Sequence, residues 1–205
     1  LAAREGEVAS VPARLLRVGF VGELGYEIHV PADRAVGVWQ ALTDAGAPHG
    51  LRYFGVEAQR LLRLEKGHII VGQDSDGLTN PFDAALGWAV KMDKPYFVGQ
   101  RSLAILARKP RKQVLTGFTL DDPAQGVPLE SHLAIEAGEI VGRMTSIAES
   151  PAVGKVIGLA YLAPALVERG KFSIRLGDGR LVGATVAATP FYDPGNARQK
   201  MEDAA

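Results

Sequence analysis

The sequence contains no cysteine, which removes disulfide bonds, thiolate nucleophiles and cysteine-bound metals from the chemistry open to this chain. No apolar run approaches the roughly 18 residues that a membrane-spanning helix needs, and the first residues lack the apolar core of a signal peptide. A chain without cysteine also suits a reducing compartment. We therefore predict a cytoplasmic protein that does not associate with a membrane.

An excess of either charge is also missing, because 23 Lys and Arg residues balance 23 Asp and Glu residues. Without a basic field to concentrate nucleic acid, we expect no nucleic-acid partner. The sequence has no GxGxxG loop and no Gly-Ser-Gly nucleophile elbow, so we expect neither flavin nor nicotinamide binding in this chain and name no catalytic residue. The histidines show no metal-ligand spacing, and we predict no metal site. They are His29, His49, His68 and His132.

What is present is the composition of a globular protein, 47% hydrophobic and 22% charged, with 205 residues that can form one large or two small domains. The first 14 residues show no apolar periodicity, and we interpret them as the cut end of a fragment. Alternating apolar residues over 16–20 and 26–30 predict two strands of a hairpin, with Glu23 near its tip. Residues 32–45 have helical spacing and are expected to form a helix across these strands.

Residues 55–87 hold the most distinctive pattern of the chain, a helix that runs into a loop rich in Gly and Asp. The predicted helix carries an apolar stripe at helical spacing and ends at Gly67. The stripe consists of Phe54, Ala58, Leu61 and Leu62. Residues 69–71 read as a short buried strand, and residues 72–77 as a turn. Asp74 and Asp76 resemble the start of a calcium loop, but the later glutamate is missing, so aspartates that cap a turn are the favoured interpretation.

A helix over 98–108 and a charged break containing proline at 109–112 follow, and we place the domain boundary at that break. Beyond it, short alternating runs predict strands, two of them joined by an Asp-Gly turn. These runs are 114–120, 132–136, 139–145, 156–161, 172–176 and 182–188. The predicted fold class is α+β: a ferredoxin-like antiparallel sheet with helices over 1–109, followed by an antiparallel β-barrel over 110–205.

Several motifs, in order along nearly the whole chain, resemble the folate-binding aminomethyltransferase family, which includes the glycine-cleavage T protein. The motifs are RVGFVGELGYE, LRLEKGHIIVGQDSDGLTNP, ALGWAV, KPYFVGQRSL and PFYDP. The wording of the second motif is most similar to the C-terminal region of the sarcosine oxidase alpha subunit. The resemblance implies a tetrahydrofolate site, with flavin and NAD in other domains or subunits of a hetero-oligomeric oxidase. It also implies a C-terminal β-barrel.

From the resemblance, Glu23 in Gly22-Glu-Leu-Gly25 is the carboxylate that binds the pteridine ring of folate, whereas the residues alone also allow a solvated turn charge. A carboxylate can accept two hydrogen bonds from neighbouring ring N–H and amino donors. Tyr26 is a second candidate for the site, although alternation places it in the core. Trp88 lies on a predicted apolar strand and is also expected in the core, although an aromatic residue beside a flat pteridine fits as well.

The helix over residues 55–66 contributes Gln59 and Arg63 as further folate-site candidates. In the T protein an arginine in a matching Ala-Arg-Asp segment contacts folate, and Gln59 takes its place here. Arg60 points about 100° around the helix and is no substitute. Arg63 and Glu65 can also be ordinary surface charges.

The resemblance implies capture by tetrahydrofolate of the one-carbon unit released when an N-methyl amine is oxidised. The family's catalytic aspartate lies in a motif that has no match here, and we expect the fragment alone to be inactive. Three alternatives stay open: a protein like the glycine-cleavage T protein, a protein like dimethylglycine dehydrogenase, and a non-catalytic module for structure or subunit contact.

Overall fold

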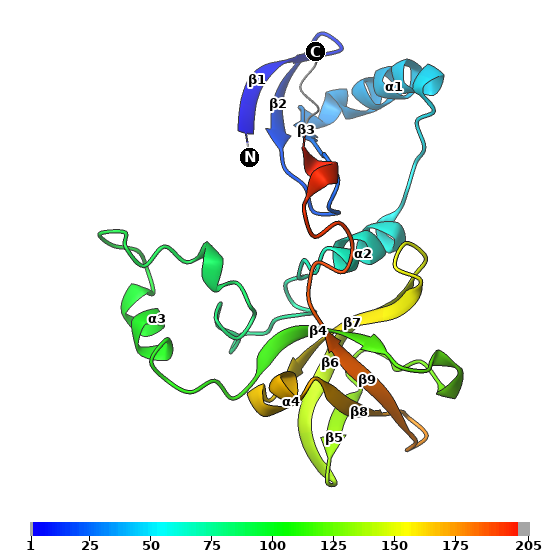
Figure 1. Ribbon diagram of the computed structural model, residues 1–205. Helices are drawn as coiled ribbons and strands as arrows, with labels where there is room; N and C mark the ends of the chain where they lie inside the picture. The colour runs from blue at the N-terminus through cyan, green and yellow to red at the C-terminus, as the bar shows by residue number, and fades with distance from the viewer. Residues whose placement is uncertain (1, 201–205) are drawn as a thin grey trace. The chain divides into compact units, whose positions relative to one another are not determined.

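The computed structural model describes residues 2–200, which separate into two compact units (Figure 1). The first unit consists of the chain up to Arg63 together with the segment that starts at Gly195, and the second consists of Leu64–Pro194. These bounds differ from a division at 109–112, and the two domains predicted from the sequence stay a prediction.

The first unit contains an antiparallel sheet in the order β1-β2-β3. Its strands are β1 (Ala2–Val8), β2 (Val11–Arg17) and β3 (Glu27–His29). β2 pairs with β3, so the predicted hairpin is present, but its first strand is Val11–Arg17 instead of 16–20 and residues 18–26 form the connection. Although residues 2–8 lack apolar periodicity, they form β1, which pairs with β2 along its whole length through a tight turn at Ala9 and Ser10, both with positive φ. The side chains of β1 are mostly exposed, so backbone pairing holds this strand without an apolar pattern.

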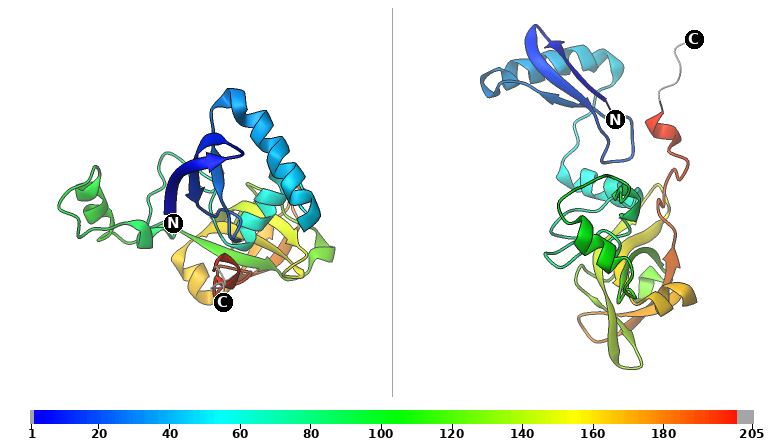
Figure 2. Two further views of the ribbon diagram at one scale, coloured as in Figure 1. Left: turned by 90° about the horizontal axis from the view of Figure 1, so that it is seen from above. Right: turned by 90° about the vertical axis from the view of Figure 1, so that its left-hand side faces the viewer.

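The predicted helix over 32–45 is confirmed as a 3-10 turn, η1 (Ala32–Arg34), followed by α1 (Ala35–Gly46) and a second turn, η2 (Ala47–His49). Figures 1 and 2 show α1 beside the three-stranded sheet. Val38 is buried, and Trp39 stacks on Tyr53 with ring centroids 5.1 Å apart.

The central helix is present as α2 (Val56–Glu65), but its predicted apolar stripe does not form the buried face. Phe54 is 65% exposed, whereas the burial lies at the C-terminal end, in four consecutive residues. These residues are Arg63, Leu64, Glu65 and Lys66. The helix ends at Glu65, and Gly67, the predicted end, lies in the turn that follows with a φ of 68°, which suits glycine.

No strand forms over 69–71. The Ile70 carbonyl accepts hydrogen bonds from the backbone N–H groups of Gln73 and Asp74, and the Ile70 N–H donates to an Asp74 carboxylate oxygen. The strand prediction was therefore wrong because turn hydrogen bonds replace ladder hydrogen bonds here. Val71, expected in the core, is 85% exposed.

The second unit contains a closed antiparallel barrel, as the sequence predicts, and its strand order is β4-β7-β6-β5-β8-β9. The strands are β4 (Val114–Leu120), β5 (Leu133–Glu136), β6 (Glu139–Ser150), β7 (Lys155–Leu162), β8 (Lys171–Arg175) and β9 (Leu181–Ala187). The shorter elements are η3 (Gly87–Ala89), α3 (Gln100–Leu106), η4 (Pro123–Gln125) and α4 (Pro164–Arg169). Pairing of β4 with β9 closes the barrel and leaves no open edge.

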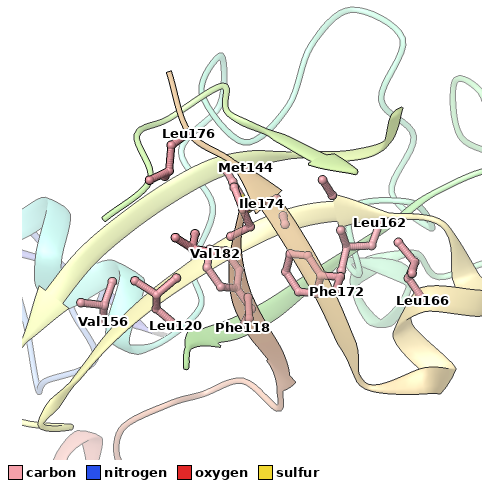
Figure 3. Close-up of a cluster of buried hydrophobic side chains, with 13 residues drawn as sticks. Phe118, Leu120, Met144, Val156, Leu162, Leu166, Phe172, Ile174, Leu176 and Val182 are labelled. Atoms are coloured by element: carbon pink, nitrogen blue, oxygen red, sulfur yellow. The ribbon is translucent and has the colours of Figure 1, made fainter. Parts of the chain in front are cut away.

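Strand β7 is buried on both faces, which explains its nearly continuous apolar sequence. Its even-numbered positions point into the barrel, where they join the cluster of buried side chains that Figure 3 shows. Its odd-numbered positions form a second apolar cluster with Leu64 and Leu115. Inside the barrel, the Phe118 and Phe172 rings meet edge to face with centroids 5.6 Å apart. Gly158 leaves the space for this packing, since a Cβ there would lie 2.4 Å from the Phe118 ring.

Candidate functional site

The segment between β2 and β3 is built around three glycines. Gly22 has a φ of 85°, which L side chains rarely adopt. A Cβ on Gly25 would lie 2.9 Å from the Val18 carbonyl oxygen, and a Cβ on Gly19 would lie 3.0 Å from the Glu23 carbonyl oxygen. The chain therefore folds tightly over itself and holds Glu23 in a fixed turn.

The carboxylate of Glu23 is partly exposed and is held by the C-terminal segment. Its side chain is 38% exposed, and Oε1 accepts a hydrogen bond from Nε of Arg198 at 2.5 Å. The Leu24 N–H donates to the Arg198 carbonyl oxygen at 3.1 Å, and an Arg17 Nη donates to the Gln199 carbonyl oxygen at 3.0 Å. The last two acceptors belong to a short 3-10 turn, η5 (Ala197–Gln199). The turn that carries the Glu23 carboxylate, together with the end of β2, is thus hydrogen-bonded to Arg198 and Gln199 of η5.

Tyr26 is 49% exposed, so its expected place in the core was wrong. The reason is the length of the strand: β3 begins only at Glu27, and Tyr26 belongs to the turn instead of the alternating ladder. Tyr26 lines a groove of about 430 Å³ together with Leu15 and Arg17 from β2 and residues 2–4 of β1. An aromatic ring at the edge of a groove can receive a flat ligand.

Gln59 and Arg63 lie one turn apart on α2. Gln59 is partly buried, and its backbone N–H donates to the Gly55 carbonyl oxygen at 3.2 Å. Arg63 is only 1% exposed, which excludes the alternative that it is an ordinary surface charge. Arg60, the neighbour of Gln59, pairs with Glu57 one helical turn earlier, with Nη1 of Arg60 4.0 Å from Oε1 of Glu57.

Trp88 belongs to the second unit and is 75% exposed. Its expected place on a buried strand was wrong, because residues 87–89 form the 3-10 turn η3 instead of a strand. Glu23 and Tyr26 therefore share one turn of the first unit, Gln59 and Arg63 share α2, and Trp88 stands in the other unit.

Buried charges at the end of α2 connect it to the chain that follows the barrel. Glu65 is 3% exposed, which corrects its expected surface position. Its Oε1 accepts from the Ser150 hydroxyl at 2.6 Å, and its carbonyl oxygen accepts from the N–H groups of Phe191 and Tyr192. Lys66 donates to the Asp193 carbonyl oxygen at 2.7 Å. The LEKG and PFYDP motifs lie far apart in the sequence but are joined by these hydrogen bonds in the fold.

The aspartates of the 72–77 loop serve the loop itself, as the sequence favours. Asp74 is fully buried, with Oδ1 accepting from the Ser146 hydroxyl at 2.6 Å and Oδ2 from the Ile70 N–H at 2.9 Å. The hydroxyl of Tyr161 donates to the Asp74 carbonyl oxygen at 2.8 Å. Asp76 accepts from the Leu78 N–H, and this bond is the main cause that holds the pKa of the Asp76 carboxyl below its ordinary value. The loop is therefore an anchor on the barrel.

Comparison with known families identifies the architecture. Residues 1–94 match the GCVT N-terminal domain, and residues 113–193 match the glycine cleavage T-protein C-terminal barrel domain. The chain belongs to the glycine-cleavage T-protein family, the aminomethyltransferases. Family membership accounts for both the sheet with helices and the six-stranded barrel. No helix within residues 2–200 is long and apolar enough to cross a membrane.

The chain is similar to relatives of two kinds, aminomethyltransferases and sarcosine oxidase alpha subunits. An aminomethyltransferase of Halothermothrix orenii is 36% identical over 186 residues, which cover 91% of this chain and 52% of the relative. A sarcosine oxidase subunit alpha of Corynebacterium sp. strain P-1 is 34% identical over 93% of this chain and 20% of the relative. The solved aminomethyltransferase T of the Bartonella henselae glycine cleavage system superposes with a TM-score of 0.78 at 26% identity, covering 87% of this chain and 49% of that one. The chain spans about half the length of the aminomethyltransferases that it matches.

The sequence patterns did not indicate Arg198, the residue of η5 that pairs with Glu23 in the turn between β2 and β3. It lies 175 residues from Glu23, and no local pattern marks it. The nearest signal is the PFYDP motif a few residues before it. This motif carries the family resemblance but does not indicate that Arg198 contacts Glu23.

Proposed function

We propose that this chain supplies the tetrahydrofolate-binding portion of an aminomethyltransferase-type protein, and that this larger protein is of the sarcosine oxidase alpha subunit type. The observation that carries the proposal is the presentation of Glu23, a partly exposed carboxylate in a turn built by glycines. The 34% identity to a sarcosine oxidase alpha subunit and the EKGHIIVGQDSDGLTNP wording support the second part.

The donor and acceptor chemistry of Glu23 fits a pteridine edge. An ionised carboxylate has about four lone-pair positions on two oxygens, and Arg198 takes one of them. The remaining positions can accept two parallel hydrogen bonds from a ring N–H and the neighbouring amino group, which fixes the ring in orientation as well as in place. Tyr26 adds an exposed aromatic ring in the same turn. We include Gln59, Arg63 and Trp88 in the proposed site on the resemblance alone.

In the proposed reaction the chain binds and orients one reactant. Tetrahydrofolate, when bound, supplies the amine that takes up a one-carbon unit to give 5,10-methylene-tetrahydrofolate. We assign the oxidation that releases this carbon from an N-methyl amine to a flavin site, with NAD, in other domains or subunits. Glu23 orients the pteridine, and the surrounding protein excludes water. The imine carbon formed by amine oxidation therefore reaches the folate amine before water can hydrolyse the imine.

Binding of tetrahydrofolate to the protein that carries this chain tests the proposal. Glu23→Gln keeps the size of the side chain but turns one acceptor oxygen into an NH2 donor that faces a donor. An unpaired buried group costs about 1–3 kcal/mol, and more where charge is involved, so calorimetry should show affinity about tenfold lower or worse. Glu27→Gln is the matched control, since Glu27 lies just beyond the same turn, is 60% exposed and pairs with His29. Equal affinity of the wild type and Glu23→Gln would overturn the proposal.

Gln59 favours a second candidate, a non-catalytic module that keeps the fold for structure or subunit contact, because an arginine that contacts folate in the T protein is replaced here. Absence of tetrahydrofolate binding by the wild type would support this candidate. Binding together with transfer from another amine would instead place the protein with the glycine-cleavage T protein or with dimethylglycine dehydrogenase.

A further inference from the structure

The segment from Gly195 to the end of η5 binds the Glu23 turn through both its side chains and its backbone. Arg198 uses Nε to donate to Glu23 and uses its carbonyl oxygen to accept from Leu24. One residue later, the Gln199 carbonyl oxygen accepts from Arg17 at the end of β2. Side-chain and backbone groups of one residue thus hold two consecutive residues of the turn.

This arrangement restricts the Glu23 carboxylate in a way that a lone surface ion pair would not. The backbone bond to Leu24 fixes where Arg198 stands, so its guanidinium meets Oε1 from a defined direction. Glutamate otherwise rotates about three side-chain bonds, and a ligand that needs both oxygens must select one arrangement. A carboxylate that is already oriented loses less entropy when the ligand binds.

We infer that Arg198 is a positioning residue of the folate site, and that residues 195–200 form part of that site although they lie far from it in the sequence. Arg198 keeps the carboxylate of Glu23 turned so that its remaining acceptor positions face the pteridine edge. The inference rests on the proposed function of Glu23 and adds a second residue and a second chain segment to it.

The test compares tetrahydrofolate affinity in the intact protein for Arg198→Gln, Arg198→Lys and a control. Because the pair is partly exposed, Arg198→Gln should weaken binding about two- to fivefold at low salt. Arg198→Lys should recover part of the loss, since it restores the charge without the planar fork. Arg34→Gln, which removes an exposed arginine paired with Asp33 in the same unit, should have no effect. In 1 M NaCl the difference between wild type and Arg198→Gln should shrink, as screening predicts for an ion pair but not for a folding defect.

A double-mutant cycle separates this inference from the proposed function. In a Glu23→Gln background, Arg198→Gln should change affinity less than about 1.5-fold, because the group that it positions has gone. If Glu23→Gln has no effect by itself, the proposed function of Glu23 falls. If Glu23→Gln weakens binding but Arg198→Gln behaves like Arg34→Gln at low salt, only the role of Arg198 is overturned.

Hydrogen exchange gives a measurement that does not depend on the ligand. The backbone N–H of Leu24 should exchange faster when residues 195–205 are deleted, since its acceptor is the Arg198 carbonyl oxygen. The N–H of Leu115, which donates to Asp83 in the second unit, should keep its protection and so report that the barrel stays folded. Unchanged exchange at Leu24 would show that the segment does not hold the turn and would overturn the inference.

Discussion

Replacing the buried carboxylate of Asp74 with an amide should destabilise the second unit. Asp74 is 0% exposed, and its carboxylate accepts hydrogen bonds from the Ser146 hydroxyl at 2.6 Å and from the Ile70 N–H at 2.9 Å. Asp74→Asn removes the charge that strengthens both bonds and places an NH2 donor against one of these donors. Hydrogen bonds to charged groups contribute about 1.5–3 kcal/mol, and a buried donor left unpaired costs about 1–3 kcal/mol. We expect the free energy of unfolding to fall by about 2–4 kcal/mol.

Urea unfolding followed by circular dichroism measures this loss. Asp178→Asn is the matched control, because Asp178 makes its bonds on the exposed turn between β8 and β9 and its change should move the midpoint little. Ser146→Ala removes only the hydroxyl partner and should produce a smaller loss than Asp74→Asn. A loss below about 0.5 kcal/mol for Asp74→Asn would refute the anchoring role of this carboxylate.

Three further predictions concern the barrel and the connection before it. Gly158→Ala places a Cβ 2.4 Å from the Phe118 ring and should reduce the free energy of unfolding by about 1–3 kcal/mol, so a stability equal to that of the wild type would contradict the packing described. Burial raises the pKa of the Tyr161 phenol above 10.0, so the folded state holds this proton more tightly than the unfolded chain does. The stability that this phenol contributes should therefore be fully present below about pH 10 and be lost as the pH rises further; Tyr161→Phe should flatten that alkaline fall, and an unaltered slope would argue against it. Trypsin should cut first within the exposed 108–112 segment, and early cuts inside either predicted domain would count against a boundary there.

The barrel could be predicted from the sequence because its strands alternate and its turns carry recognisable residues. The β5–β6 hairpin turns at Ala137 and Gly138, both with positive φ, which are the two residues between the predicted runs 132–136 and 139–145. Strand β1 could not be found in this way, since its side chains are mostly exposed and backbone pairing alone holds it. Trp88 was misplaced for another reason: the apolar run around it predicted a strand, but residues 87–89 form the 3-10 turn η3 and leave its side chain exposed.

Buried charges mark the second limit of sequence reasoning. Glutamate is usually exposed on a helix, but Glu65 is buried, and its carboxylate accepts a hydrogen bond from Ser150, which lies 85 residues away. The contact between Glu23 and Arg198 spans 175 residues. In both cases the residues that satisfy the charge are brought together only by the tertiary fold, so no local pattern predicts them. The family resemblance could point to Glu23 but not to its partner.

The fate of the released carbon tests the central claim most directly. The protein that carries this chain is supplied with an N-methyl amine and tetrahydrofolate, and formaldehyde and 5,10-methylene-tetrahydrofolate are both measured. We predict that the wild type and Glu27→Gln form mainly methylene-tetrahydrofolate. Glu23→Gln should oxidise the amine at the same rate but release the carbon mainly as formaldehyde, because the folate is bound about tenfold more weakly or worse. The same product ratio in Glu23→Gln and the wild type would show that Glu23 is an ordinary turn residue and would contradict the proposed folate site.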